Sequence, residues 1–348
     1  MSEQHTKRKA RKRKTNKVVV AILSLLIVAA MSVCAVGAMK LIESMPKKST
    51  DEPSTVSTVS VEPKPEPIVK VASATIASTG DLLMHMPIIT GAYDNNTKTY
   101  DFSKIYTYLG KYAAAADYAV ANLETTLRGT EDGAKYSGYP TFNCPDSIVT
   151  ATKNAGFDML LTANNHSYDK GLKGFLRTLD VIDSEGIDRI GTMKTEEEPK
   201  YTVKDINGIK IGMACYTYET ETGKEGRKAL NGIMLASEAT NLINSFSYER
   251  LDAFYTDLKG QLDGMKAQGA EATVVYIHWG DEYRLTANKK QIERAQQLCN
   301  LGVDVIVGGH AHVVEPIDLL TSETDPDHKT VCLYSMGNAV SNQRKERA

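Results

Sequence analysis

The stretch GVDVIVGGHAHV, residues 302–313, reads as a short β-branched strand that runs into two glycines and then two histidines. Glycine lets the backbone approach a ligand closely, and imidazoles two positions apart on non-helical chain can point into one pocket. His310 and His312 could therefore bind a metal ion through neutral nitrogens. A hydrogen-bonded pair of core histidines would also fit this stretch. This stretch alone does not distinguish metal ligands from core histidines.

The same arrangement, an apolar run followed by a polar side chain that can bind a metal, recurs along the chain. Strand-like runs at 72–79, 118–121, 157–161, 272–277, 302–309 and 330–334 lead to Asp81, Glu124, Asn165 with His166, His278, His310 with His312, and Asn338. Five of the seven histidines, His85 among them, fall at such ends. Open α/β sheets bind ligands beyond the carboxyl ends of their strands, so we expect these side chains to meet.

Amphipathic stretches alternate with these runs and predict an α/β domain. Helices are expected at 100–116, 145–156, 171–184, from about 247 onward, and at 289–301. The pair Asn207-Gly208 predicts a hairpin, so part of one sheet should be antiparallel. Residues 219–246 are polar and aperiodic, and we expect an irregular excursion over the surface near the site.

The beginning of the chain differs in composition from the rest. Residues 1–17 hold eight Lys or Arg against one Glu, a net charge of +7 in a chain whose total is −2. Residues 18–39 are 22 positions without a charge, about 33 Å as a helix, which is enough to cross a membrane. Basic residues before this span place the N-terminus in the cytoplasm and the rest outside. A cleaved signal peptide, with Val36-Gly37-Ala38 as its small-residue site, is the alternative.

The predicted organisation is a basic cytoplasmic head at 1–17, a transmembrane anchor at 18–39, a Pro/Ser/Thr-rich linker at 40–72 and an extracellular domain at 73–348. The basic head also suits contact with anionic lipid. The residues after it carry a net charge of −9, which disfavours a nucleic-acid partner. The cysteines beyond the anchor match no disulfide or metal framework, and we expect buried free thiols at Cys144, Cys215, Cys299 and Cys332.

The candidate ligands combine the carboxylates of Asp81 and Glu124, the amide of Asn165 and several imidazoles, with no thiolate. Oxygen and nitrogen donors of this kind suit Mn, Fe or Zn. Two such ions close together can share a carboxylate and clamp a phosphoryl group. Helix capping is the alternative role for Asp81 and Glu124, because short acidic side chains often start helices.

The order of these motifs resembles the CapA-type capsule-synthesis proteins, which are associated with poly-γ-glutamate synthesis and form a branch of the calcineurin-like metallophosphoesterases. The matching motifs are Gly80-Asp81, Asn122-Leu123-Glu124, Asn164-Asn165-His166 with Asp169 and Gly171, His278-Trp279-Gly280 with Glu282, Gly309-His310-Ala311-His312, and Ser335 with Gly337-Asn338. The resemblance implies a four-layer α/β/β/α sandwich of two mixed sheets, with the site along one edge.

The resemblance also implies roles for single residues. Two divalent ions would be held by Asp81, Glu124, Asn165, His278, His310 and His312. His166 would protonate the leaving group, and Asp169 would orient it. Further candidates for the site are His85, Asn164, Glu282 and Asn338.

The chain departs from the wider superfamily at two positions. His85 follows Asp81 by four residues where two are usual, and Glu124 stands where an aspartate is usual. Relatives usually continue through further strands after the motif at Asn338, so the resemblance implies either a fragment or a domain that lacks an edge of the second sheet.

On these grounds we expect a single-pass bacterial membrane protein whose extracellular domain is a metal-dependent, phosphoester-type hydrolase. It would act in the synthesis, export or anchoring of an anionic capsule polymer such as poly-γ-glutamate. Its partners would be the lipid bilayer, the polymer or a phosphoester substrate, and other membrane subunits of a capsule synthetase. The alternative is a non-catalytic polymer-binding or scaffold subunit of such a complex, since a fold does not fix a function.

Overall fold

The structure, a computed structural model, describes residues 71–222 and 227–343, which belong to one compact unit spanning 69–348. The predicted head at 1–17, the anchor at 18–39 and almost all of the linker at 40–72 lie outside the described residues. Within those residues, no helix has the length and apolar character that crossing a bilayer requires.

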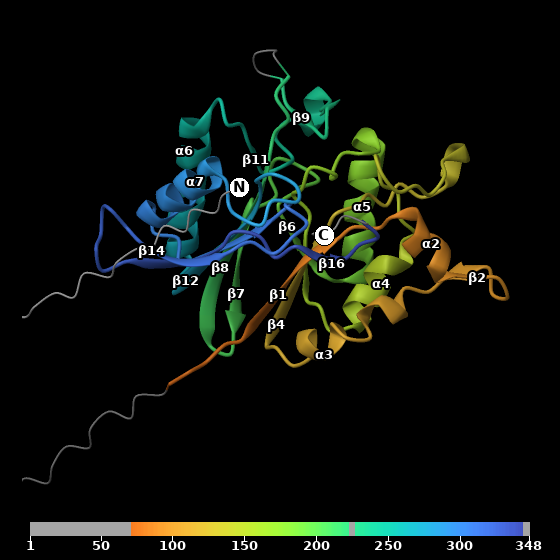
Figure 1. The fold of residues 1–348 in the computed structure, drawn as a ribbon, viewed down its shortest axis with the longest axis horizontal. Helices are drawn as coiled ribbons and strands as arrows, with labels where there is room; N and C mark the ends of the chain where they lie inside the picture. The colour runs from red at the N-terminus through yellow and green to blue at the C-terminus, as the bar shows by residue number, and fades with distance from the viewer. Residues whose placement is uncertain (1–70, 223–226, 344–348) are drawn as a thin grey trace, which may run out of the picture. The chain divides into compact units, whose positions relative to one another are not determined.

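Two sheets form the centre of the unit (Figure 1). The first has the order β16-β1-β4-β5-β6, and every neighbouring pair is parallel. Its strands are β1 (Ile76–Leu82), β4 (Tyr118–Leu123), β5 (Met159–Leu161), β6 (Asp188–Ile190) and β16 (Asn338–Val340). The last described strand thus pairs with the first, and Asp81 lies opposite Asn338.

The second sheet has the order β11-β8-β12-β13-β15-β14, and β7 also pairs with β8. It is mixed, because β7–β8 and β14–β15 are antiparallel and the other pairs are parallel. Its strands are β7 (Tyr201–Ile206), β8 (Ile209–Tyr218), β11 (Ser245–Phe246), β12 (Ala272–His278), β13 (Val305–Gly309), β14 (Ile317–Thr321) and β15 (Lys329–Leu333). The hairpin predicted at Asn207-Gly208 is confirmed, since these residues join β7 to β8.

Apolar clusters divide the unit into four layers. Met159 of β5, Met213 of β8 and Tyr276 of β12 belong to a cluster between the sheets. A second cluster packs helices on the outer face of the first sheet, and a third packs helices on the second sheet. The helices are α4 (Ser147–Asn154) and α5 (Gly171–Glu185) on one side, and α6 (Leu251–Ala267) and α7 (Lys289–Asn300) on the other (Figure 1). The predicted mixed α/β fold is confirmed.

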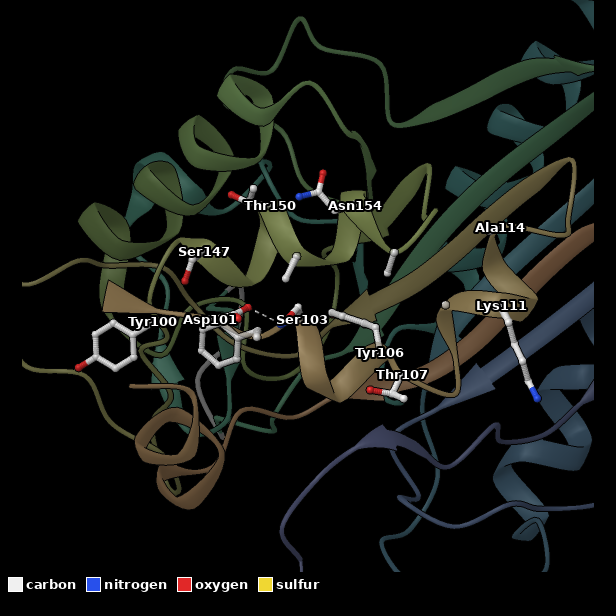
Figure 2. Close-up of a pocket in the computed structure, with 14 residues that line it drawn as sticks. Tyr100, Asp101, Ser103, Tyr106, Thr107, Lys111, Ala114, Ser147, Thr150 and Asn154 are labelled. Atoms are coloured by element: carbon white, nitrogen blue, oxygen red, sulfur yellow. Dashed lines mark hydrogen bonds between the residues drawn. The ribbon is translucent and has the colours of Figure 1, made fainter. Parts of the chain in front are cut away.

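The prediction of a single helix at 100–116 is wrong. The segment after α2 (Met86–Ala92) and β2 (Tyr93–Asp94) forms β3 (Thr99–Tyr100), a 3-10 helix η1 (Ser103–Tyr106) and the short helix α3 (Gly110–Ala113). Asp101 accepts a hydrogen bond from the backbone of Ser103 at 2.8 Å, which starts a local turn that competes with a continuous helix. A cavity of about 610 Å³ lies between this segment and α4 (Figure 2), and its lining contains none of the candidate metal ligands.

The excursion at 219–246 is more regular than predicted. It contains a hairpin of β9 (Ala229–Leu230) and β10 (Ile233–Met234), a 3-10 helix η3 (Ser237–Ala239), and β11, which joins the second sheet. Asn231 and Gly232 form the turn with φ angles of 49° and 74°. A two-residue hairpin turn of this type needs positive φ at both positions, and Asn-Gly supplies it.

A close backbone contact joins β1 to the segment that crosses from the second sheet to the first. Met336 N donates to Gly308 O of β13, and Asp81 N donates to Gly337 O, both at 3.0 Å. A Cβ atom added at Gly80 would lie 1.9 Å from that same Gly337 oxygen. Glycine at position 80 is therefore needed for the approach that fixes Asp81.

We expect Gly80→Ala to destabilise the protein by about 3 kcal/mol, because the backbone near Gly337 must move to admit a methyl group. Gly260, exposed on α6, has no atom within 4 Å of an added Cβ and serves as the matched control. Gly260→Ala should stabilise by about 0.5–1 kcal/mol, the usual helix preference for alanine. Urea denaturation measures both, and unchanged stability of Gly80→Ala would contradict the close contact.

Candidate metal centre

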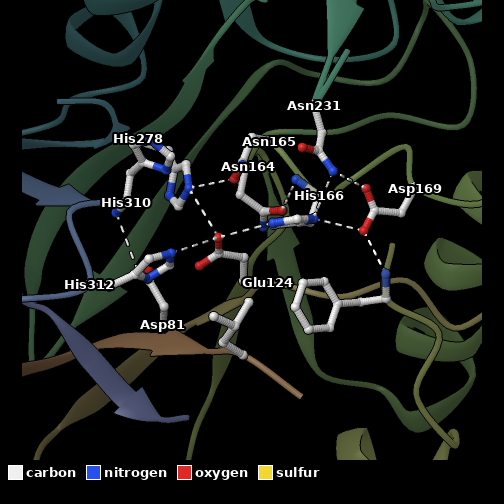
Figure 3. Close-up of polar contacts among 12 residues, drawn as sticks. Asp81, Glu124, Asn164, Asn165, His166, Asp169, Asn231, His278, His310 and His312 are labelled. Atoms are coloured by element: carbon white, nitrogen blue, oxygen red, sulfur yellow. Dashed lines mark hydrogen bonds and ion pairs between the residues drawn. The ribbon is translucent and has the colours of Figure 1, made fainter. Parts of the chain in front are cut away.

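Strand ends from both sheets bring the six predicted ligands together at one edge of the unit (Figure 3). In the first sheet, Asp81 lies in β1, Glu124 directly follows β4, and Asn165 lies in the turn after β5. In the second sheet, His278 ends β12, and the pair His310 and His312 follows β13. All six side chains are buried.

Two overlapping groups of side chains can each surround an ion. One group is Glu124, His310 and His312, and the other is Asp81, Glu124 and His278. Within each group the ligand atoms lie within 4.8 Å of one another. Asn165 borders the second group, since its Oδ1 lies 2.9 Å from His278 Nε2. Glu124 belongs to both groups, so its carboxylate would help to hold an ion in either one.

Asp81 is held by hydrogen bonds from both sheets. Its Oδ1 accepts from Asn122 Nδ2 at 2.7 Å, and its Oδ2 accepts from the backbone of His310 at 3.3 Å. The same Oδ2 lies 3.2 Å from His312 Nδ1. Asp81 lies inside a strand and Glu124 just after one, so neither caps a helix, and the alternative role is wrong.

The turn after β13 takes an unusual backbone path. His310 and His312 have φ angles of 89° and 58°, a region that residues with a side chain rarely adopt. Such conformations persist where the surroundings fix them, and they cluster at functional sites. A Cβ at Gly309 would lie 3.1 Å from Asp81 Oδ1 and 3.3 Å from His278 Nδ1, so glycine there keeps room for the cluster.

The unpaired atoms of the cluster fit a divalent cation. Among the described residues, neither carboxylate oxygen of the buried Glu124 has a hydrogen-bond partner, and the same holds for His310 Nδ1. Burying a carboxylate without hydrogen bonds is costly, and a bound cation would compensate it. Two carboxylates, an amide and three imidazoles are donors that suit Mn, Fe or Zn.

Burial and neighbouring charge set different protonation states for the two histidines after β13. Burial, together with repulsion from His278 and His312, lowers the pKa of His310 well below its usual range. Burial alone would also lower the pKa of His312, but the charge of Glu124 and the hydrogen bond with Asp81 raise it to about 9. In the metal-free protein, these shifts favour the charged imidazolium for His312 at neutral pH and the neutral imidazole for His310.

The burial of Asp81 would by itself raise the pKa of its carboxyl. The hydrogen bond from His312 and the charges of His278 and His312 outweigh this effect and hold the pKa well below its usual range. Asp81 is therefore ionised and ready to bind a cation.

His166 and Asp169 form a hydrogen-bonded pair beside the cluster. His166 Nδ1 lies 2.7 Å from Asp169 Oδ2, and His166 Nε2 lies 4.0 Å from Glu124 Oε1. Burial would lower the pKa of His166, but the hydrogen bond and charge of Asp169 raise it above its ordinary value. One ring nitrogen is thus fixed, and the other faces the cluster, where it can give a proton to a bound group.

Two of the further candidates support the ligands through hydrogen bonds. Asn164 donates to the backbone oxygen of Leu123 at 2.9 Å, next to Glu124. Asn338 Oδ1 lies 3.0 Å from His312 Nδ1. Both therefore help to orient residues of the cluster.

The other two candidates lie outside both ligand groups. His85 Nδ1 lies 3.2 Å from Leu83 O, and its ring packs edge-on against Phe142, which also contacts His166. Glu282 is exposed, and its charge adds to the rise in the pKa of His312. Neither residue has the position of a ligand in this arrangement.

Three residues of the site were not singled out from the sequence. Asn122 binds Asp81, the ring of Tyr218 lies 4.8 Å from that of His310, and Asn231 donates to Asp169 Oδ1 at 3.1 Å. Asn122 stands in the motif that ends at Glu124, and Asn231-Gly232 repeats the hairpin signal of Asn207-Gly208. The sequence therefore contains a signal for Asn122 and for Asn231. Tyr218 ends a long apolar strand, and no local signal marks it.

Comparison with known proteins relates the chain to capsule synthesis. A family profile described as "Bacterial capsule synthesis protein PGA_cap" matches residues 75–343. The chain is similar to "PGA biosynthesis protein CapA" of Bacillus subtilis (strain 168), with 26% identity over 283 residues, covering 80% of this chain and 66% of that protein. It is 25% identical over 274 residues to "Capsule biosynthesis protein CapA" of Bacillus anthracis, covering 77% and 60%. The chain thus spans less than two thirds of the length of these relatives.

A solved structure of a hypothetical protein from Thermus thermophilus is 12% identical, with a TM-score of 0.39, and the match covers 75% of each chain. Similarity at this level carries no weight for the fold or the function.

Metal binding by the purified, metal-free protein should grow stronger as the pH rises. His312 has a pKa of about 9 without metal, so it must lose a proton before it can bind an ion. Affinity for Zn or Mn should rise about tenfold per pH unit from pH 7 and level off near the pKa, with protons released at pH 7. Isothermal titration in two buffers of different ionisation enthalpy measures both quantities.

Three variants complete this measurement. His312→Asn should remove most of the pH dependence, and Glu124→Gln should weaken binding at least about 100-fold at every pH, because both ligand groups share that carboxylate. His328→Asn is the control, since that imidazole contacts Val303 O, away from the cluster. An affinity that stays constant between pH 7 and 9 would contradict ligation by His312.

Proposed function

Because the chain belongs to the family of bacterial capsule synthesis proteins PGA_cap, we propose that it is a metal-dependent hydrolase in the synthesis, export or anchoring of an anionic capsule polymer such as poly-γ-glutamate. The family match at residues 75–343 contains every residue of the cluster. The names of the two Bacillus relatives, which refer to PGA and capsule biosynthesis, support the choice of polymer.

The observation that best supports a metal-dependent activity is the buried carboxylate of Glu124, whose oxygens have no hydrogen-bond partner among the described residues. Its Oε1 lies 3.4 Å from His278 Nε2 and 4.0 Å from His312 Nε2. A surface that only binds polymer has no need for such a costly group, whereas an ion-binding site does. The ions would be held by Asp81, Glu124, Asn165, His278, His310 and His312. When bound, divalent Mn, Fe or Zn polarises a phosphoester or acyl oxygen and acidifies water.

His166 is the proposed proton donor to the leaving group. Asp169 accepts from its Nδ1 at 2.7 Å, which leaves Nε2 directed toward Glu124 and the substrate side. The raised pKa of His166 favours the protonated ring, which would supply the proton that the departing oxygen needs. Asp169 acts as the orienting partner and keeps the imidazolium stable.

The proposed location of this domain is outside the cell, on a single membrane anchor at residues 18–39. The support comes from the sequence alone, from the uncharged span and the basic residues before it. The lipid bilayer and other membrane subunits of a capsule synthetase would then be its partners.

Anchoring can be tested in cells. The full chain should remain in the membrane fraction after washing with salt and alkali, and a variant without residues 1–39 should be released. Full-length protein that appears in the wash would contradict the anchor, and an N-terminus that starts after Ala38 would favour the cleaved signal peptide.

Purified full chain loaded with Mn or Zn should hydrolyse an aryl phosphate. His166→Asn should lower kcat about 100- to 10,000-fold, the usual contribution of a general acid, while metal affinity stays unchanged. His328→Asn should retain both activity and metal.

The alternative function, a non-catalytic polymer-binding or scaffold subunit, makes the opposite prediction for this experiment. Metal-loaded wild type that turns over neither the aryl phosphate nor a γ-linked glutamyl polymer, and that co-purifies with membrane subunits, would overturn the hydrolase and leave the scaffold.

A further inference from the structure

We propose that Asn231 is a positioning residue that fixes the Asp169–His166 pair and so aims the proton donor at the substrate. The inference rests on the proposed function of the same site. Asn231 lies at the turn of the β9–β10 hairpin, far along the chain from the pair that it contacts (Figure 3).

The amide group of Asn231 bridges two segments of the site. Its Nδ2 lies 3.1 Å from Asp169 Oδ1 and 3.1 Å from Pro140 O. It also lies 3.3 Å from His166 Nδ1. An amide nitrogen has two hydrogens, and a carboxylate and a carbonyl are the two pure acceptors among these three groups. Both hydrogens are therefore used, and His166 Nδ1 keeps its own hydrogen for Asp169.

Asp169 is held at both carboxylate oxygens. Oδ2 accepts from His166 Nδ1 and from the backbone of Phe142, each at 2.7 Å. Among the described residues, Oδ1 accepts from Asn231 and has no other partner. Asp169 is buried, so water cannot easily replace this bond. Without Asn231, one oxygen of the carboxylate loses its restraint, and the plane of the carboxylate, which sets the direction of the His166 ring, becomes free to rotate.

The β9–β10 hairpin packs against the segment that carries His166 and Asp169. Leu230, next to Asn231, belongs to an apolar cluster with Tyr168, which lies between His166 and Asp169 in the chain, and with Phe175 of α5. Ala236, which follows β10, donates to Tyr168 Oη at 3.3 Å. The hairpin is therefore packed on the segment that carries His166 and Asp169, and its turn places Asn231 above them.

A matched pair of variants isolates the side chain from the turn. Asn231-Gly232 and Asn207-Gly208 are both two-residue hairpin turns with positive φ, 49° and 74° in one and 54° and 84° in the other. Glycine tolerates these angles, so Asn231→Gly and Asn207→Gly each remove an amide while the turn is kept. The Asn207 turn joins β7 to β8, and its amide donates to Ser73 O rather than to the pair.

In the metal-loaded full chain, Asn231→Gly should lower kcat about 10- to 100-fold with KM unchanged, the usual effect of losing an outer hydrogen bond to a catalytic group. Asn231→Asp should lower kcat at least as much, because a carboxylate cannot donate a hydrogen bond to Asp169 and repels its charge. Asn207→Gly should match wild type in kcat. Equal kcat for Asn231→Gly and Asn207→Gly, at equal melting temperatures, would overturn the proposal.

A second readout does not depend on turnover. The imidazole N–H of His166 that is bonded to Asp169 should give a downfield, slowly exchanging proton resonance, assigned by its loss in His166→Gln. This resonance should persist in Asn207→Gly and broaden or vanish in Asn231→Gly. If it is unchanged in Asn231→Gly, Asn231 does not position the pair. If wild type shows no hydrolysis but the resonance responds as expected, the proposed activity fails while the positioning role stands.

Discussion

The carboxylate of Asp81 receives hydrogen bonds from both sheets, and the edge that carries the site depends on them. One oxygen is bonded by Asn122 of the first sheet, and the other by the backbone of His310 after the second. The carboxylate is fully buried, so positive groups must gather around it. His312 does so, and the glycine at position 80 brings the backbone close enough for the arrangement to form.

Burial alone does not decide what each histidine of the site does. Burial, together with the imidazoles of His278 and His312, lowers the pKa of His310 and leaves a neutral nitrogen suited to a metal. His166 is equally buried, but the hydrogen bond and charge of Asp169 reverse the effect, raise its pKa and favour the protonated ring. The same environment thus contains side chains that can surround an ion on one side and the proposed proton donor on the other, with Glu124 between them.

Much of the site could be predicted because its residues follow apolar runs, and parallel strands end at the same edge of a sheet. Asp81, Glu124, His278 and His310 converge for that reason, although their roles as ligands stay predictions. Other features of the fold depend on contacts that the local sequence does not reveal. The three residues of β16 carry no strand pattern and become a strand only beside β1. The amphipathic pattern at 100–116 gave way to a local turn at Asp101. The membrane anchor lies outside the described residues, so that prediction is untested.

The pairing of β16 with β1 joins the two ends of the described chain. During translation the first of these strands leaves the ribosome long before the second, and His310 and His312 also come late. Long-range pairing of this kind forms slowly, because most of the chain must be present before its ends can meet. A nascent chain therefore lacks the assembled cluster, and any ion that the proposed site holds would be acquired only where folding finishes.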